Sequence, residues 1–150
     1  RVKWMGPDMI VRSSISARHM ETWAHAQAIY DALGVDRVNE DRIKNIVIIG
    51  NNTFKYCFTI NKKNLPAETP YLKLTSPSGE IWEFNNQEND NFIQGLAEEF
   101  CQVVTQVRNI DDVNLNVKGE IANEWMSIAQ CFAGAAEQPP KPGLRKKVKK

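Results

Sequence analysis

The sequence predicts an α+β domain in which helices cover a small antiparallel sheet, preceded by one long helix. Three observations predict this fold. Helical periodicity recurs near the start, after the middle and near the end of the chain; alternating apolar and polar residues mark short segments between the helices; and a Pro-Ser-Gly turn at residues 77–79 joins two of those segments. Helices grouped on one face of a small antiparallel sheet make this fold class.

The long helix is predicted over residues 13–34. Ser13 and Ser14 can cap its start, no Pro or Gly interrupts its interior, and Gly34 is a natural stop. Two faces of this helix are candidates for burial, and two buried faces suit a helix inside a bundle. One face holds Ile15, His19, Thr22, Ala26, Ile29 and Leu33, and the other holds Ser14, Arg18, Glu21, His25, Ala28 and Ala32.

The remaining elements follow in order. The patterns predict three further helices, each with apolar residues at helical intervals, and four or five extended segments with the two-residue period of a strand. The helices are expected over residues 41–52, 96–107 and 119–134, and the extended segments over residues 54–60, 71–76, 80–84, 91–95 and 113–119.

Composition fits one ordinary domain or a small domain with an attached element. The 150 residues are 42% hydrophobic and 25% charged, with a net charge of +1. Because the last six residues, RKKVKK, hold five positive charges, the folded part is mildly acidic, which argues against a specific nucleic-acid partner. Residues 135–150 are rich in Pro, Lys and Gly, so we expect a disordered basic tail whose removal changes stability little.

The cysteines and the hydropathy pattern favour the cytoplasm. Cys57, Cys101 and Cys131 are odd in number, widely spaced and free of any C-x-x-C motif. Each lies in an apolar run, where a cysteine is more often a small buried core residue than a catalytic thiol. No apolar run of 18 residues occurs, so no membrane partner is expected.

Glu21 and His25 are the candidate reactive pair. Their i, i+4 spacing places a carboxylate and an imidazole one turn apart on one helix face, where both could bind a single divalent ion. His19, the other histidine, points roughly 160° away from Glu21 and cannot complete the site from the same helix. Judged by spacing alone, a Glu–His pair of this kind more often forms a surface hydrogen bond or a solvated charge pair than a metal site.

Most of the chain up to about Gly134 resembles a known family. The residues that carry the resemblance are KWMGPDMIVRSSISARHMETWAHAQAIYDALG with its METWAHxQxIxDALG signature, followed downstream by LAEEFCQVVTQ, the acidic pair Asp111-Asp112, and EWMSIAQCFAG. They are similar to the mycothiol-dependent maleylpyruvate isomerase and DinB-like metal-binding superfamily. The more specific similarity is to its bacterial branch labelled "wyosine base formation" proteins.

The resemblance implies a division of the chain and a metal site. Residues 1–35 would be the last helix of a metal-binding four-helix bundle, residues 36–134 a C-terminal domain similar to sterol-carrier-protein folds, and residues 135–150 the tail. Glu21 and His25 would supply two ligands of a divalent metal, most readily zinc, and a third histidine would come from an earlier bundle helix that this chain lacks. A low-molecular-weight thiol is a further implied cofactor.

Two functions of different classes follow. The chain could be the C-terminal part of a metal- and thiol-dependent isomerase or transferase, incomplete without the third ligand, with Arg18 orienting the Glu21 carboxylate or a substrate anion. Alternatively it could be a non-catalytic module that binds a small apolar ligand or associates with a partner. Whether it is an enzyme stays open. We expect a homo-oligomer formed through residues 10–33, with no metal tightly bound by one chain, because two ligands are too few.

Overall fold

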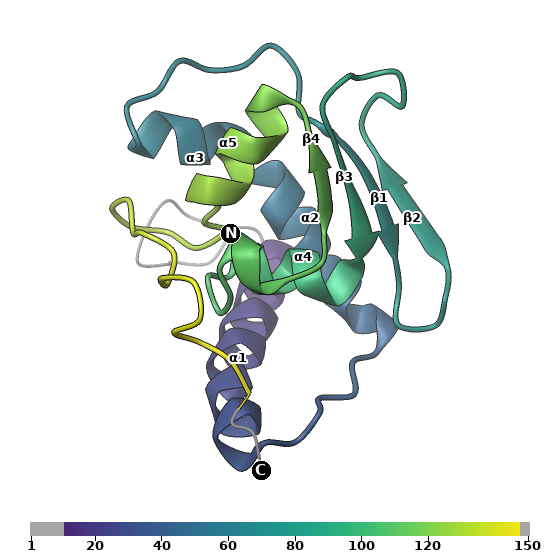
Figure 1. Cartoon of the computed structure of the whole chain (residues 1–150), viewed down its shortest axis with the longest axis vertical. Helices are drawn as coiled ribbons and strands as arrows, with labels where there is room; N and C mark the ends of the chain where they lie inside the picture. Colours follow the sequence, from purple (N-terminus) through teal and green to yellow (C-terminus); the bar gives the residue numbers. More distant parts are fainter. Residues whose placement is uncertain (1–10, 148–150) are drawn as a thin grey trace.

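The structure is a computed structural model that describes residues 11–147; the ends of the predicted first segment and of the predicted tail lie outside that range. It confirms the α+β class, with the helices on one side of a small sheet (Figure 1). The α-helices are α1 Val11–Leu33, α2 Lys44–Asn52, α3 Phe54–Ile60, α4 Ala97–Val104 and α5 Glu120–Ile128; short 3-10 turns span Asp41–Ile43 and Ile110–Asp112; and the strands are β1 Tyr71–Thr75, β2 Ile81–Phe84, β3 Phe92–Leu96 and β4 Asn116–Lys118.

The sheet is mixed, so the prediction of an antiparallel sheet was wrong in one pairing. The strand order is β2-β1-β3-β4, with β1 and β3 parallel and the outer pairs antiparallel. The hairpin returns the chain to the end where β1 begins, because Phe84 lies opposite Leu72. The loop over residues 85–91 stays at that end, with the Asn85 side chain donating to the Pro70 carbonyl at 2.8 Å. The next strand must therefore run in the same direction as β1.

Residues 54–60 form helix α3 and not the predicted strand. Phe54, Cys57 and Phe58 are the buried residues, at helical spacing i, i+3 and i+4, whereas the apparent two-residue alternation included Tyr56, which is only half-buried. A run of aromatic and β-branched residues satisfies both periods over so short a length. Packing decided the outcome here, because α3 lies against α5 and supplies aromatic rings to the core.

The core lies between the inner face of the sheet and helices α2 to α5. Trp125 of α5 is fully buried at its centre, with its ring 4.9 Å from Phe54 and 5.7 Å from Phe100, both edge to face. Phe100 and Trp125 thus face the core, in two helices whose apolar residues recur at helical intervals. Helix α5 ends at Ile128, before the predicted Gly134, because the chain turns extended there and the Cys131 amide donates to the Val104 carbonyl at 2.8 Å.

Residues 134–147, here called the C-terminal strap, run along the folded domain where a disordered tail was expected (Figure 1). Two buried glutamines anchor its first part. The Glu137 amide donates to the Gln130 side-chain oxygen at 2.8 Å, and the Gln106 side-chain nitrogen donates to the Glu137 carbonyl at 3.0 Å. Composition did not predict this contact, since the polar partners belong to the core and not to the strap.

Deleting residues 135–150 should lower the free energy of unfolding by about 2 kcal/mol, which corresponds to a fall in melting temperature of roughly 4–8 °C. The reason is that the buried side-chain oxygen of Gln130 would lose the hydrogen bond that the Glu137 amide donates to it. Thermal unfolding followed by circular dichroism measures this change. Deleting only residues 144–150 is the control, because Leu144 is 70% exposed and little of that end is buried. Equal melting temperatures for the long deletion and the intact chain would contradict the anchoring role of Gln130.

Candidate functional site

The candidate pair lies on the outer surface of α1. His25 Nε2 is 3.5 Å from Glu21 Oε2, and the two side chains are 84% and 48% exposed. Two ligands of a tetrahedral zinc ion at its usual bond lengths are about 3.3 Å apart, so this pair fits one edge of such a site. The helix thus brings both predicted ligands together in an orientation open to a further ligand.

The described residues do not complete a metal centre. Among them there is no group of three His, Cys, Asp or Glu side chains placed to hold an ion. His19 lies on another side of α1, half-buried, where burial and then the neighbouring Arg42 and Arg37 guanidinium groups lower its pKa. The remaining ligands of a metal at Glu21 and His25 would have to come from outside residues 11–147 of one chain.

A cavity of about 420 Å³ adjoins the pair. It lies between α1, the segment after α4 and the C-terminal strap. Glu21 and His25 line one side and Glu137 and Arg145 of the strap line another, while apolar side chains complete the wall, among them Met20, Val107 and Phe132. The cavity thus presents charged groups of both signs beside apolar side chains.

Arg18, the predicted orienting residue, is exposed one turn before Glu21. Within residues 11–147 it forms no ion pair with that carboxylate, whose close contact is His25. Its role toward a substrate anion stays a prediction.

The face of α1 that packs on the domain is neither of the two predicted faces. Met20, Trp23 and Gln27 are its buried residues, spaced i, i+3 and i+7. The Trp23 indole donates to the Asn39 side chain at 2.8 Å, and Asn39 in turn donates to Glu98 at 2.7 Å. One large aromatic with a satisfied N–H outweighs several smaller apolar residues, so the predicted stripe of Ile15, Ile29 and Leu33 faces outward instead.

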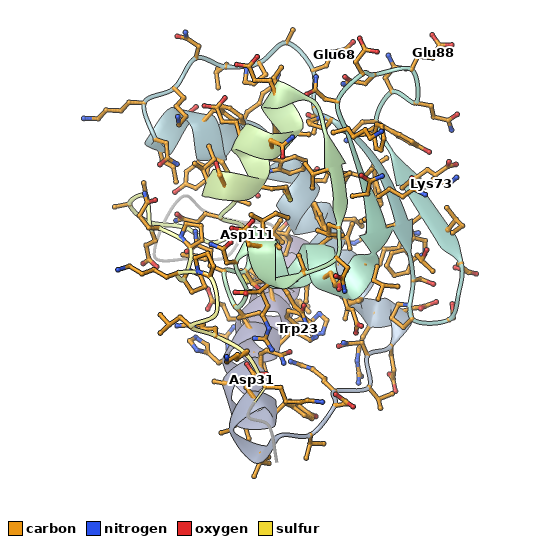
Figure 2. All side chains as sticks on the ribbon, viewed as in Figure 1. Trp23, Asp31, Glu68, Lys73, Glu88 and Asp111 are labelled. Atoms are coloured by element: carbon orange, nitrogen blue, oxygen red, sulfur yellow. The ribbon has the colours of Figure 1, made fainter. Side chains whose placement is uncertain are left out.

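A nearly buried ion pair fixes the second half of α1. Arg108 donates to both carboxylate oxygens of Asp31, at 2.7 and 2.6 Å, and the two side chains are 11% and 15% exposed. Burial by itself would raise the pKa of Asp31, but hydrogen bonds from Arg108 and Gln27 outweigh it and lower that pKa. Sequence reasoning missed this pair because 77 residues separate its members. Figure 2 shows Trp23 and Asp31 along α1, at the opposite end of the molecule from Glu68 and Glu88.

The three cysteines are free and buried, as their apolar surroundings predict. Burial raises the pKa of each thiol, most strongly at Cys101 and Cys131. A thiol that stays protonated is a poor nucleophile, so these side chains act as core residues.

None of the helices among residues 11–147 is long and apolar enough to cross a membrane. No protein-family model matches the chain, and no solved structure matches it. Two curated relatives are uncharacterised proteins of Mycobacterium tuberculosis, one from strain CDC 1551 / Oshkosh and one from strain ATCC 25618 / H37Rv. Each is 40% identical to this chain over 134 residues, which make up 89% of this chain and 52% of the relative. The chain therefore spans about half the length of the curated relatives it matches.

Proposed function

We propose that this chain is part of a divalent-metal-dependent protein in which Glu21 and His25 supply two of the metal ligands. The single observation behind the proposal is the 3.5 Å separation of His25 Nε2 and Glu21 Oε2 on an exposed helix face beside a cavity. An oxygen and an imidazole nitrogen suit zinc and other first-row divalent ions. The resemblance to the maleylpyruvate isomerase and DinB-like superfamily points the same way.

A divalent ion at this position would lower the pKa of a bound water or of a low-molecular-weight thiol and so generate a nucleophile near neutral pH. The chain's own residues would do the rest. Arg145 lines the same cavity as His25 and would attract an anionic group, and the apolar side chains of the lining would contact the body of a small substrate. The reaction class that follows is isomerisation or group transfer on a small organic molecule, in the cytoplasm.

Zinc affinity tests this proposal. We expect Glu21→Gln and His25→Ala each to weaken zinc binding by at least about tenfold, or about 1.4 kcal/mol, because each removes a ligand. Competition with a chromophoric chelator measures the affinity. His19→Ala is the matched control, since His19 lies on the same helix but away from the pair. Equal zinc affinity for all four proteins would rule out a metal at Glu21 and His25.

The exposed face of α1 supports a second candidate function, a non-catalytic association module. Four of the eleven large apolar residues that are exposed within residues 11–147 lie on α1, namely Val11, Ile15, Ile29 and Leu33. Patches of this kind usually mark a binding surface. As such a module the chain would form a homo-oligomer through residues 10–33 and bind a small apolar ligand in the cavity. Sedimentation velocity of the chain at micromolar concentration tests it, because a monomer at all concentrations would contradict self-association.

A further inference from the structure

Two adjoining cavities lie between α1 and the C-terminal strap. One is the cavity of about 420 Å³ described above, and the second has a volume of about 360 Å³. They share five lining residues, which are Ala24, His25, Val107, Leu144 and Arg145. Lys146 of the strap lines the smaller cavity as well. The end of the strap therefore forms a wall of both cavities, beside α1 (Figure 1).

The first part of the strap, up to Pro140, is fixed to the domain by side-chain amides. Gln130 and Gln106, which are 1% and 6% exposed, hold the main chain of Glu137 through the two hydrogen bonds already described. The Asn109 side chain donates to the Pro140 carbonyl at 2.9 Å. This part of the strap is therefore tied to groups that themselves belong to the folded core.

The last part of the strap, residues 141–147, is held by charged groups at the surface. The Gly143 amide donates to both carboxylate oxygens of Asp112, at 3.0 and 2.9 Å. Lys147 Nζ lies 2.5 Å from Asp36 Oδ1, and these two side chains are 44% and 88% exposed. Exposed ion pairs stabilise a structure little. A segment held in this way opens locally far more readily than one anchored in the core.

The same segment brings free positive charge to the smaller cavity. Within residues 11–147, neither Arg145 nor Lys146 forms an ion pair, although both line this cavity. Asp31, the acidic side chain of its lining, is already paired with Arg108. The remaining wall is made largely of small and apolar side chains. A small organic anion fits such a cavity, with its charged group on the two cations and its apolar body against the wall.

We propose that residues 141–147 are a lid that opens at Pro140 and closes over a small organic anion bound by Arg145 and Lys146. Both cations belong to the lid, whereas the apolar wall belongs to α1 and the segment after α4. The anion contacts both sides at once only when the lid is closed, so its binding favours the closed lid. The proposal rests on the proposed function in one respect, because it takes the cavities beside Glu21 and His25 as the substrate site. The lid itself needs no metal.

Amide hydrogen exchange tests the lid on the chain of residues 1–150, followed by NMR in the presence of a chelator. Asp112→Ala should speed the exchange of the Gly143 amide by at least about tenfold, because that amide loses its charged acceptor. The Glu137 amide should keep its rate, since it lies before the point of opening. Asp111→Ala is the matched control, because it removes the adjacent carboxylate and leaves Asp112 in place. An unchanged rate at Gly143, or an equal increase at Glu137, would overturn the lid.

A fluorescent dye, anilinonaphthalene sulfonate, tests the anion site, because it joins one sulfonate to an apolar body. At saturation it should slow the exchange of the Gly143 amide by at least about fivefold. Replacing both cations, as Arg145→Gln with Lys146→Gln, should weaken dye binding by at least about tenfold. Lys141→Gln is the matched control, since Lys141 is a strap cation that lines neither cavity. The neutral analogue phenylnaphthylamine should bind the doubly substituted chain and the unmodified chain equally.

The lid and the metal site can fail separately. Equal dye affinity for the doubly substituted and unmodified chains, or a Gly143 exchange rate that the dye does not change, would overturn the lid over an anion site. Both experiments are run without metal, so such a result would leave the effect of Glu21→Gln and His25→Ala on zinc affinity as it is. Equal zinc affinity for those variants would instead overturn the metal function and leave the lid in place.

Discussion

Trp125→Ala is expected to lower the free energy of unfolding by about 4 kcal/mol, one of the two largest effects of a single substitution in this protein. Trp125 is fully buried and its ring contacts Phe54 of α3 and Phe100 of α4, so its removal leaves a cavity where three helices meet. The aromatic neighbours cannot move together to fill that space without leaving their own packing. Urea denaturation at neutral pH measures the change.

Two further substitutions show how much of this loss comes from the aromatic ring and how much from burial. Trp125→Phe should cost only about 1–2 kcal/mol, because the indole N–H has no hydrogen-bond partner within residues 11–147 and a phenyl ring retains most of the contact area. Ile48→Ala, at a position of α2 that is 38% exposed, should cost less than about 1 kcal/mol. A loss below about 1 kcal/mol for Trp125→Ala would mean that the core does not centre on this residue.

Most elements could be located from the sequence because the apolar pattern repeats over a long segment or because a distinctive turn joins two segments. The helix expected over residues 96–107 is present as α4, although it ends at Val104, and the hairpin about the Pro77-Ser78-Gly79 turn is present as β1 and β2. Each of the two predictions rests on several agreeing signals. The seven residues of α3 were too few to distinguish the helical period from the two-residue period of a strand. The parallel pairing of β1 with β3 depends on where a seven-residue loop crosses the end of the sheet, and no local pattern carries that information.

The candidate site was half predictable for a related reason. Local spacing places Glu21 and His25 on one face, and the structure has them 3.5 Å apart. Spacing does not say which face of α1 meets the domain, because that depends on Asn39, Glu98 and Arg108, which lie on other segments. The stripe of apolar residues looked like the buried face, yet it faces outward because Trp23 forms the contact. The outward stripe is the surface on which the proposed self-association depends.

The second large effect is expected at the ion pair that joins α1 to the rest of the domain. Arg108→Ala should lower the free energy of unfolding by about 3 kcal/mol at pH 7, because it leaves the Asp31 carboxylate nearly buried without its partner. Replacing both residues, as Asp31→Leu with Arg108→Leu, should cost less than Arg108→Ala alone, since no unpaired charge remains. Hydrogen exchange should show the loss first in the second half of α1, around Asp31.

The effect of Arg108→Ala should also depend on pH in a fixed direction. The pKa of Asp31 is lower in the folded chain than in the unfolded chain, where a carboxyl group of this kind titrates near about 3.9. The stabilisation is therefore complete above that unfolded pKa and is lost as the pH falls through the lower, folded pKa. The stability difference between the unmodified chain and Arg108→Ala should be constant from pH 7 to about pH 5 and shrink below about pH 4. A difference that grows as the pH falls would mean that Asp31 is not the partner whose charge Arg108 stabilises.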